Sequence, residues 1–143
     1  MALKRRKRTL AAVKVGIIAL VLLTGAVVAL SAYNQRLERA YDLSVVGQGV
    51  PVVVQVHDPD CPFCVELRRN VESITGEFDS RELLIRYAEL PTSEGAAFAR
   101  LYGAERVTLL FFDAQGELKA HQAGVQEPEQ LRRTFRRLAA GEL

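Results

Sequence analysis

The sequence predicts an α/β fold in which a mixed central sheet is flanked by helices and preceded by one N-terminal transmembrane helix. Three observations support this prediction: short apolar runs typical of buried strands, helical periodicity between those runs, and an uncharged apolar segment near the N-terminus. The expected order after that segment is β-α-β-α-β-β-α. Helices between apolar strands imply a mainly parallel sheet covered on both faces, with an antiparallel hairpin at its end.

The apolar segment follows a basic cluster. Residues 4–8 are all Lys or Arg, and residues 15–32 contain no charge. A stretch of about 18 apolar residues is long enough to cross a hydrocarbon core as a helix, and positive charge favours the cytoplasmic side. We therefore expect a cytoplasmic basic tail at residues 1–9 and a transmembrane anchor at residues 10–32 that contacts the lipid bilayer.

A cleaved signal peptide is the alternative for this segment. Ala29 and Ser31 form a small-x-small site before Ala32, although the apolar stretch is longer than most signal peptides carry. Both interpretations place the remaining chain on the same side of the membrane. We expect a single-pass protein of the bacterial inner (cytoplasmic) membrane, with its C-terminal domain periplasmic or otherwise extracytoplasmic.

The chain after residue 32 divides into a juxtamembrane linker at residues 33–49 and one domain at residues 50–143. Beyond residue 32 there are 13 basic and 17 acidic residues, a net charge of −4. The overall charge of +2 therefore reflects the basic tail, and nothing in the domain indicates nucleic acid binding.

Each element of the domain follows from a local pattern. Strands are expected where β-branched and apolar residues run together, at residues 50–57, 82–90, 107–112 and 117–124. Helices are expected where apolar residues recur every three or four positions, after Cys61 to about Phe78, over residues 92–103, and from Pro128 onwards. The last strand alternates more than the others and is expected nearer an edge of the sheet.

Cys61 and Cys64 are the only cysteines, and they lie between the first strand and the first helix of the domain. Two cysteines are too few for a disulfide-built scaffold in a domain of this size. A dithiol can exchange with a disulfide when one thiolate attacks and a second thiol resolves the mixed disulfide. Cys61 at the helix N-terminus, where Pro62 suits the first turn, is expected to be the nucleophile, and Cys64 the resolving thiol.

The element order, together with the sequence "DCPFC" at a strand-to-helix junction, resembles the thioredoxin superfamily. The segment "TLLFFDAQGELKAHQAG" is similar to the hairpin that follows the substrate loop of that family. The resemblance implies a thioredoxin-like fold over residues 50–140 and a redox disulfide between Cys61 and Cys64. It also implies protein disulfides or dithiols as substrates, a membrane or periplasmic electron donor or acceptor, and no cofactor.

Three positions depart from the family pattern. Asp60 stands where thioredoxins have a tryptophan, Gln55 replaces a buried acid, and Val107 replaces a cis-proline in the substrate loop formed by Arg106, Val107 and Thr108. A cis bond before a non-proline residue costs about 2.5–4 kcal/mol, so we expect a trans Arg106–Val107 bond with the N–H facing the Cys61 sulfur. We also expect Val107→Pro to raise disulfide reductase activity at little cost in stability.

The neighbours of the cysteines are expected to tune the chemistry. Asp58, Asp60 and Glu66 disfavour a thiolate by like charge, which favours a reductase or exchange partner over a strong oxidase. His57 would offset them if it were protonated. Phe63 either presents an apolar surface to substrates or packs in the core.

Other roles for the cysteines stay open at this stage. The domain could be a non-catalytic, thioredoxin-like module that binds a partner in an envelope assembly, with an inert structural disulfide. Metal binding by His57, Cys61, Cys64 and His121 is less favoured because those residues lie on separate elements, and we expect no metal site. Copper delivery is disfavoured further because Met1 is the only methionine.

Overall fold

The computed structural model describes the backbone of residues 2–143 and the side chains of residues 16–143 except 19, 36 and 37. The side chains of the basic cluster at residues 4–8 and of Lys14 lie outside the described residues. The chain forms two compact units that divide between Glu38 and Arg39.

The first unit is helical. Helix α1 spans Ala2–Tyr41, and within its described part the segment Gly16–Tyr41 is long and apolar enough to cross a membrane. Large apolar side chains along it are exposed, among them Ile17, Leu23 and Val28. The apolar N-terminal helix expected from the sequence is thus present, and the large apolar side chains described along it are exposed.

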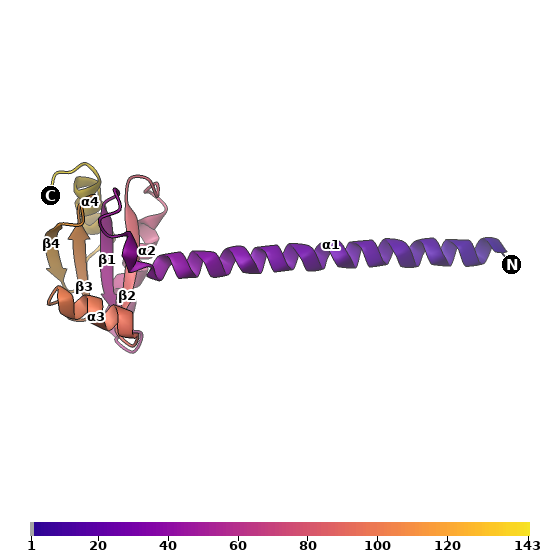
Figure 1. The fold of residues 1–143 in the computed structure, drawn as a ribbon, viewed down its shortest axis with the longest axis horizontal. Coiled ribbons are helices and arrows are strands. Elements are labelled where there is room, and N and C mark those ends of the chain that lie inside the picture. The colour runs from indigo at the N-terminus through magenta and orange to yellow at the C-terminus, as the bar shows by residue number, and fades with distance from the viewer. Residues whose placement is uncertain (1) are drawn as a thin grey trace. The chain divides into compact units, whose positions relative to one another are not determined.

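The second unit contains a four-stranded sheet (Figure 1). Its strands are β1 (Val52–His57), β2 (Leu84–Glu89), β3 (Thr108–Phe112) and β4 (Leu118–Ala123), in the spatial order β2-β1-β3-β4. The helices that connect or follow them are α2 (Pro62–Thr75), α3 (Ser93–Leu101) and α4 (Pro128–Ala139), and a short 3-10 turn, η1, spans Leu43–Val45. The predicted mixed α/β fold and element order are confirmed.

The expectation of a mainly parallel sheet is wrong. β1 and β2 are parallel, whereas β3 is antiparallel to both β1 and β4. Helix α3 has only nine residues and crosses the sheet near one end instead of running back along the strands (Figure 1). A helix of that length advances about 14 Å, less than a six-residue strand, so β3 begins at the end of the sheet where β1 and β2 finish.

Alternating side chains of the strands form two cores. Val53, Ile85 and Phe111 lie on the face covered by α2 and α4, while Val54 and Phe112 lie on the face covered by α3 and η1. Side chains alternate along β1, so residues 53, 55 and 57 point away from the face of Val54 and towards the face covered by α2. This arrangement directs the polar side chains at the end of β1 towards the cysteine-bearing helix.

Candidate active site

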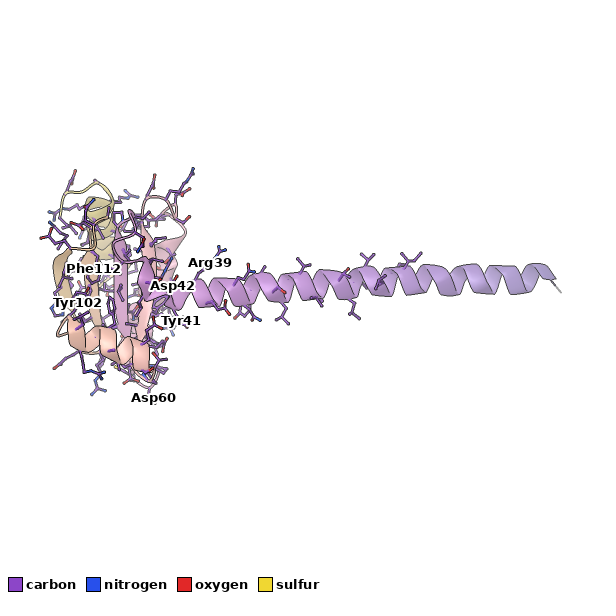
Figure 2. All side chains as sticks on the ribbon, viewed as in Figure 1. Arg39, Tyr41, Asp42, Asp60, Tyr102 and Phe112 are labelled. Carbon is purple, nitrogen blue, oxygen red and sulfur yellow. The ribbon has the colours of Figure 1, made fainter. Side chains whose placement is uncertain are left out.

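The two cysteines occupy the first turn of α2. Cys61 is the N-cap residue, Pro62 is the first helical residue, and Cys64 lies on the inward face of the helix. The preceding loop is closed by two hydrogen bonds to Asp58: the Cys61 N–H donates to its carbonyl oxygen at 3.1 Å, and the Asp60 N–H donates to Oδ1 at 3.0 Å. Figure 2 shows Asp60 at the tip of the domain, beside this turn.

The cysteines differ in their access to solvent. Cys64 is fully buried, and Cys61 keeps only 7% of its surface exposed. Phe63, between them in the sequence, is 62% exposed. The sulfur expected at the surface is therefore narrowly accessible, and Phe63 is a surface residue and not part of the core.

Backbone N–H groups act on the Cys61 thiol. Hydrogen bonding from the Cys64 N–H lowers the pKa of Cys61, and the Phe63 N–H and the Arg106 guanidinium act in the same direction against the effect of desolvation. The Cys61 side chain makes no capping hydrogen bond, and hydrogen bonding from the Cys64 side chain also lowers the pKa of Cys61. Orphan N–H groups at a helix N-terminus are expected to favour a thiolate in this way.

The expectation that acidic neighbours prevail at Cys61 is wrong. Asp60 and Glu66 are exposed, so water screens their charges. The carboxylate of Asp58 is partly covered, and the Arg106 guanidinium lies 3.9 Å from it. Because helix N–H groups and Arg106 outweigh these carboxylates, the Cys61 thiolate is stabilised relative to an ordinary cysteine.

Cys64 lies in a different environment. Burial raises the pKa of Cys64, since its thiolate would lose contact with water, while the backbone N–H groups of Asp58 and Val107 act to lower it. The two thiols are therefore displaced in opposite directions from the usual cysteine pKa. This difference is suited to an attacking thiolate at Cys61 and a protonated second thiol at Cys64.

A buried polar pair lies beneath the motif. The Gln55 Nε2 group donates to the Cys64 carbonyl oxygen at 3.0 Å and lies 3.4 Å from His57 Nδ1. Both side chains are buried. Desolvation lowers the pKa of His57, with Glu89 opposing this, so a protonated His57 does not supply the positive charge considered from the sequence. The alternation of β1 was the signal for this orientation.

Val107 adopts an unusual backbone conformation. The described residues contain no cis peptide bond, so the Arg106–Val107 bond is trans, as expected. Val107 has φ of +60°, and it is the one described residue other than glycine with a positive φ. A β-branched side chain disfavours this region strongly. Hydrogen bonding from the Val107 backbone acts to lower the pKa of the buried Cys64. Proline requires φ of about −65°, so the expectation that Val107→Pro costs little stability is reversed by the observed φ.

Thr108 begins β3 directly after this residue and is buried. It pairs with Val56 of β1 on one side and with Ala123 of β4 on the other. The predicted substrate loop therefore consists of an exposed Arg106, a half-buried Val107 and a Thr108 that belongs to the sheet. Arg106 and Val107 are the two loop residues that act on the cysteines.

Two surface hollows flank the motif. The first, of about 520 Å³, is lined by the charged residues Asp58, Arg100, Glu105 and Arg106 and by the apolar residues Leu90, Ala96, Ala99 and Ala104. The second, of about 490 Å³, is lined by residues of the cysteine loop and α2, namely Pro59, Asp60, Pro62, Val65, Glu66 and Arg69. Both hollows are open to solvent and carry charged residues of either sign.

The four residues considered from the sequence as possible metal ligands do not lie close together. His121 is exposed on β4, which β3 separates from β1, whereas His57 is buried on the α2 face. No cluster of three or more His, Cys, Asp or Glu side chains suitable for a metal ion occurs in the described part of the chain. The structure therefore gives no support to that alternative.

Comparisons with known proteins agree with the fold of the domain. A family model described as "Thioredoxin-like domain" matches residues 43–139. An uncharacterized thioredoxin-like protein from Clostridium perfringens superposes with a TM-score of 0.60 at 23% identity, over 68% of this chain and 78% of that one. A mutant thioredoxin from Halobacterium salinarum NRC-1 gives a TM-score of 0.57 at 24% identity, over 67% and 80% of the two chains.

A third structure, Trxlp from Edwardsiella tarda EIB202, gives a TM-score of 0.54 at 21% identity and covers 64% of this chain and 87% of that one. These likenesses concern the fold. The search of curated proteins found no match.

Proposed function

The chain belongs to the thioredoxin-like family, and we propose that it is a membrane-tethered, extracytoplasmic thiol–disulfide oxidoreductase that uses the Cys61/Cys64 dithiol. The observation that carries the proposal is the contrast between the thiols. Cys61 lies at a helix N-terminus with a lowered pKa, and Cys64 is buried beside it with a raised pKa. Dithiols that act in two steps need this difference between the attacking and the resolving sulfur.

The proposed reaction has two displacement steps. The Cys61 thiolate attacks one sulfur of a substrate disulfide, which forms a mixed disulfide and releases the first substrate thiolate. Cys64 then loses its proton and attacks the Cys61 sulfur, which forms the Cys61–Cys64 disulfide and releases the second substrate thiolate. Two electrons pass from the dithiol to the substrate, and a membrane or periplasmic donor returns them. The reverse sequence oxidises a substrate dithiol.

We propose reduction or exchange over strong oxidation. Strong oxidants of this chemistry stabilise the reduced form through a highly favoured thiolate. Here one guanidinium, that of Arg106, acts on Cys61, and it also faces the Asp58 carboxylate 3.9 Å away. The lowered pKa of Cys61 makes the Cys61/Cys64 dithiol–disulfide couple more oxidising than expected from the sequence. Because the Arg106 guanidinium also interacts with Asp58, its stabilisation of the Cys61 thiolate is limited.

A second candidate function is a partner-binding module with an inert disulfide. The narrow exposure of Cys61 and the valine in the substrate loop favour it, because both restrict the approach of a substrate sulfur. The two functions differ in one measurable respect: an oxidoreductase forms mixed disulfides through a single cysteine, and an inert module forms none.

Mixed-disulfide trapping tests the proposed function. In the full chain expressed in bacterial membranes, Cys64→Ser is expected to accumulate mixed disulfides with other proteins because the resolving thiol is missing. Cys61→Ser is expected to accumulate few, since the remaining thiol is fully buried. Acid quenching, thiol blocking and paired non-reducing and reducing gels provide the measurement. The double variant is the control, and equal trapping by both single variants, or by neither, would favour the inert module.

Membrane topology is the second test. The basic cluster before the apolar helix is expected to keep the N-terminus in the cytoplasm and to place the domain outside it. An alkaline phosphatase fusion after residue 60 should therefore be active, and a cytoplasmic fluorescent reporter fused at the same residue should be dark. The opposite pair of results would place the dithiol in the cytoplasm and contradict the proposed location.

A further inference from the structure

A third surface cavity, of about 400 Å³, lies at the end of β2, and neither cysteine lines it. Its lining residues, all in the second unit of the chain, are Tyr41, Tyr87, Glu89, Thr92, Glu94 and Gly95. We call it the tyrosine–glutamate cavity. Small-molecule sites usually have volumes of about 300–1,000 Å³ and a few polar groups among apolar ones. This cavity has that size, and the proposed thiol chemistry does not use it.

A cation already lies on the aromatic residues of the cavity. The Arg68 guanidinium carbon is 4.3 Å from the ring centroid of Tyr87 and 5.9 Å from that of Tyr41. The Arg68 Nη2 group also donates to the Tyr41 hydroxyl at 3.2 Å. A cation within about 6 Å of a tyrosine ring is attracted by the negative face of the ring. The two tyrosines therefore form a surface on which positive charge is stable.

Carboxylates outnumber cations around these rings. Arg68 is shared between two of them, since its Nε group donates to Glu72 at 2.8 Å and its Nη1 group to Glu89 at 3.2 Å. Glu94 is exposed and forms no ion pair with another described residue. One guanidinium thus faces three carboxylates, which leaves a local charge of −2 that favours a further cation.

Tyr87 adds a polar group without a partner. Tyr87 is only 6% exposed, and its hydroxyl forms no hydrogen bond with another described residue, although buried polar groups are nearly always bonded. The Thr92 hydroxyl, in contrast, donates to the Glu89 carbonyl oxygen at 2.8 Å and accepts from the Gly95 N–H at 3.0 Å. The acceptors that the described residues leave over in the cavity are therefore carboxylate oxygens and the Tyr87 oxygen, which call for a donor.

We propose that the tyrosine–glutamate cavity binds a primary ammonium group, whose N–H groups donate to the carboxylates of Glu89 and Glu94 and to the Tyr87 oxygen. The half-buried Tyr41 ring contacts the alkyl chain that carries the ammonium. A primary ammonium has three N–H donors, as a lysine side chain does, whereas a quaternary ammonium has none, so these oxygens select the primary group. Free alkylamines and phosphatidylethanolamine headgroups both carry this group.

Titration with n-butylammonium tests the proposal. In the full chain in a non-ionic detergent, the ring resonances of Tyr41 and Tyr87 are followed by nuclear magnetic resonance, and saturable shifts are expected. 1-Butanol has the same alkyl chain without the charge and should cause no saturable shift. Tetramethylammonium should bind more weakly because it donates no hydrogen bond. Absence of a saturable n-butylammonium shift, or equal binding of all three compounds, would overturn the proposal.

Two variants connect the binding to the cavity. Tyr87→Phe removes only the hydroxyl and is expected to weaken n-butylammonium binding about 10-fold, since a hydrogen bond to a charged group is lost. Glu94→Gln removes an exposed charge and is expected to weaken it about 2- to 5-fold. Glu105→Gln, the same change at an exposed acid outside the cavity, is the matched control and should have no effect. Binding by Glu94→Gln and Tyr87→Phe as tight as by the control would contradict the proposed site.

Lipid nanodiscs distinguish the two sources of the ammonium group. If a headgroup is the ligand, the tyrosine resonances should differ between discs with phosphatidylethanolamine and discs of phosphatidylglycerol alone, and Glu94→Gln should reduce this difference. Identical spectra in the two discs, with n-butylammonium binding retained, would assign the site to a free amine. Because Cys61→Ser should bind the amine as the wild type does, failure of the thiol chemistry and failure of this site are separate results.

Discussion

Gly95→Ala is expected to lower the free energy of unfolding by at least about 3 kcal/mol. Gly95 lies in the first turn of α3, where its N–H donates to the Thr92 hydroxyl at 3.0 Å. A Cβ atom there would lie 2.2 Å from the carbonyl oxygen and 2.5 Å from the nitrogen of Glu89. Both are backbone atoms at the end of β2, so the strand or the helix must move. Urea denaturation followed by near-ultraviolet circular dichroism measures the loss.

Gly76→Ala is the control for this prediction. Gly76 ends α2 with φ of −66°, and a Cβ atom added to it would meet no heavy atom within 4 Å. Alanine there restricts the unfolded chain without strain, so a stabilisation of up to about 1 kcal/mol is expected. If Gly95→Ala were as stable as Gly76→Ala, the close approach of α3 to β2 would be wrong.

The fold was largely predictable because its elements are local patterns. Apolar strands, a helical stripe after the cysteines, and Thr92 as the N-cap of α3 all follow from residue type and spacing. The direction of β3 was not predictable, since it depends on how α3 crosses the sheet and not on the pattern of β3 itself. The need for glycine at position 95 was equally hidden, because it arises from Glu89, six residues away in another element.

The identity of the reactive residues could be predicted from the sequence, but the direction of their pKa shifts could not. The junction of β1 and α2 indicated Cys61 and Cys64, but counting nearby carboxylates gave the wrong direction for the pKa of Cys61. Charges close in sequence can be exposed and screened, whereas N–H groups that the sequence does not display lie at the sulfur. The positive φ of Val107 is a second hidden feature, since valine is among the residues least expected there.

Phe135→Ala is expected to lower the free energy of unfolding by about 3–5 kcal/mol. Phe135 is fully buried on α4, with ring centroids 5.8 Å from Phe78 and 6.0 Å from Phe111. It belongs to the core that also contains Leu67 and Val71 of α2, so the cavity would loosen the helix that begins at Cys61. A loss of this size is a large share of the stability of about 5–15 kcal/mol that a small domain has.

Phe63→Ala separates this packing effect from a functional one. Phe63 lies on the same helix but is 62% exposed, so its removal should change stability by less than about 0.5 kcal/mol. If Phe63 contacts substrates, its alanine variant should raise KM for a protein disulfide while leaving the reaction of Cys61 with a small alkylating reagent unchanged. Phe135→Ala should instead lower the denaturation midpoint and speed alkylation of Cys64, because local opening of α2 exposes the buried thiol. Equal stability of the two variants would contradict the packing of α4 against α2, since only Phe135 lies in that core.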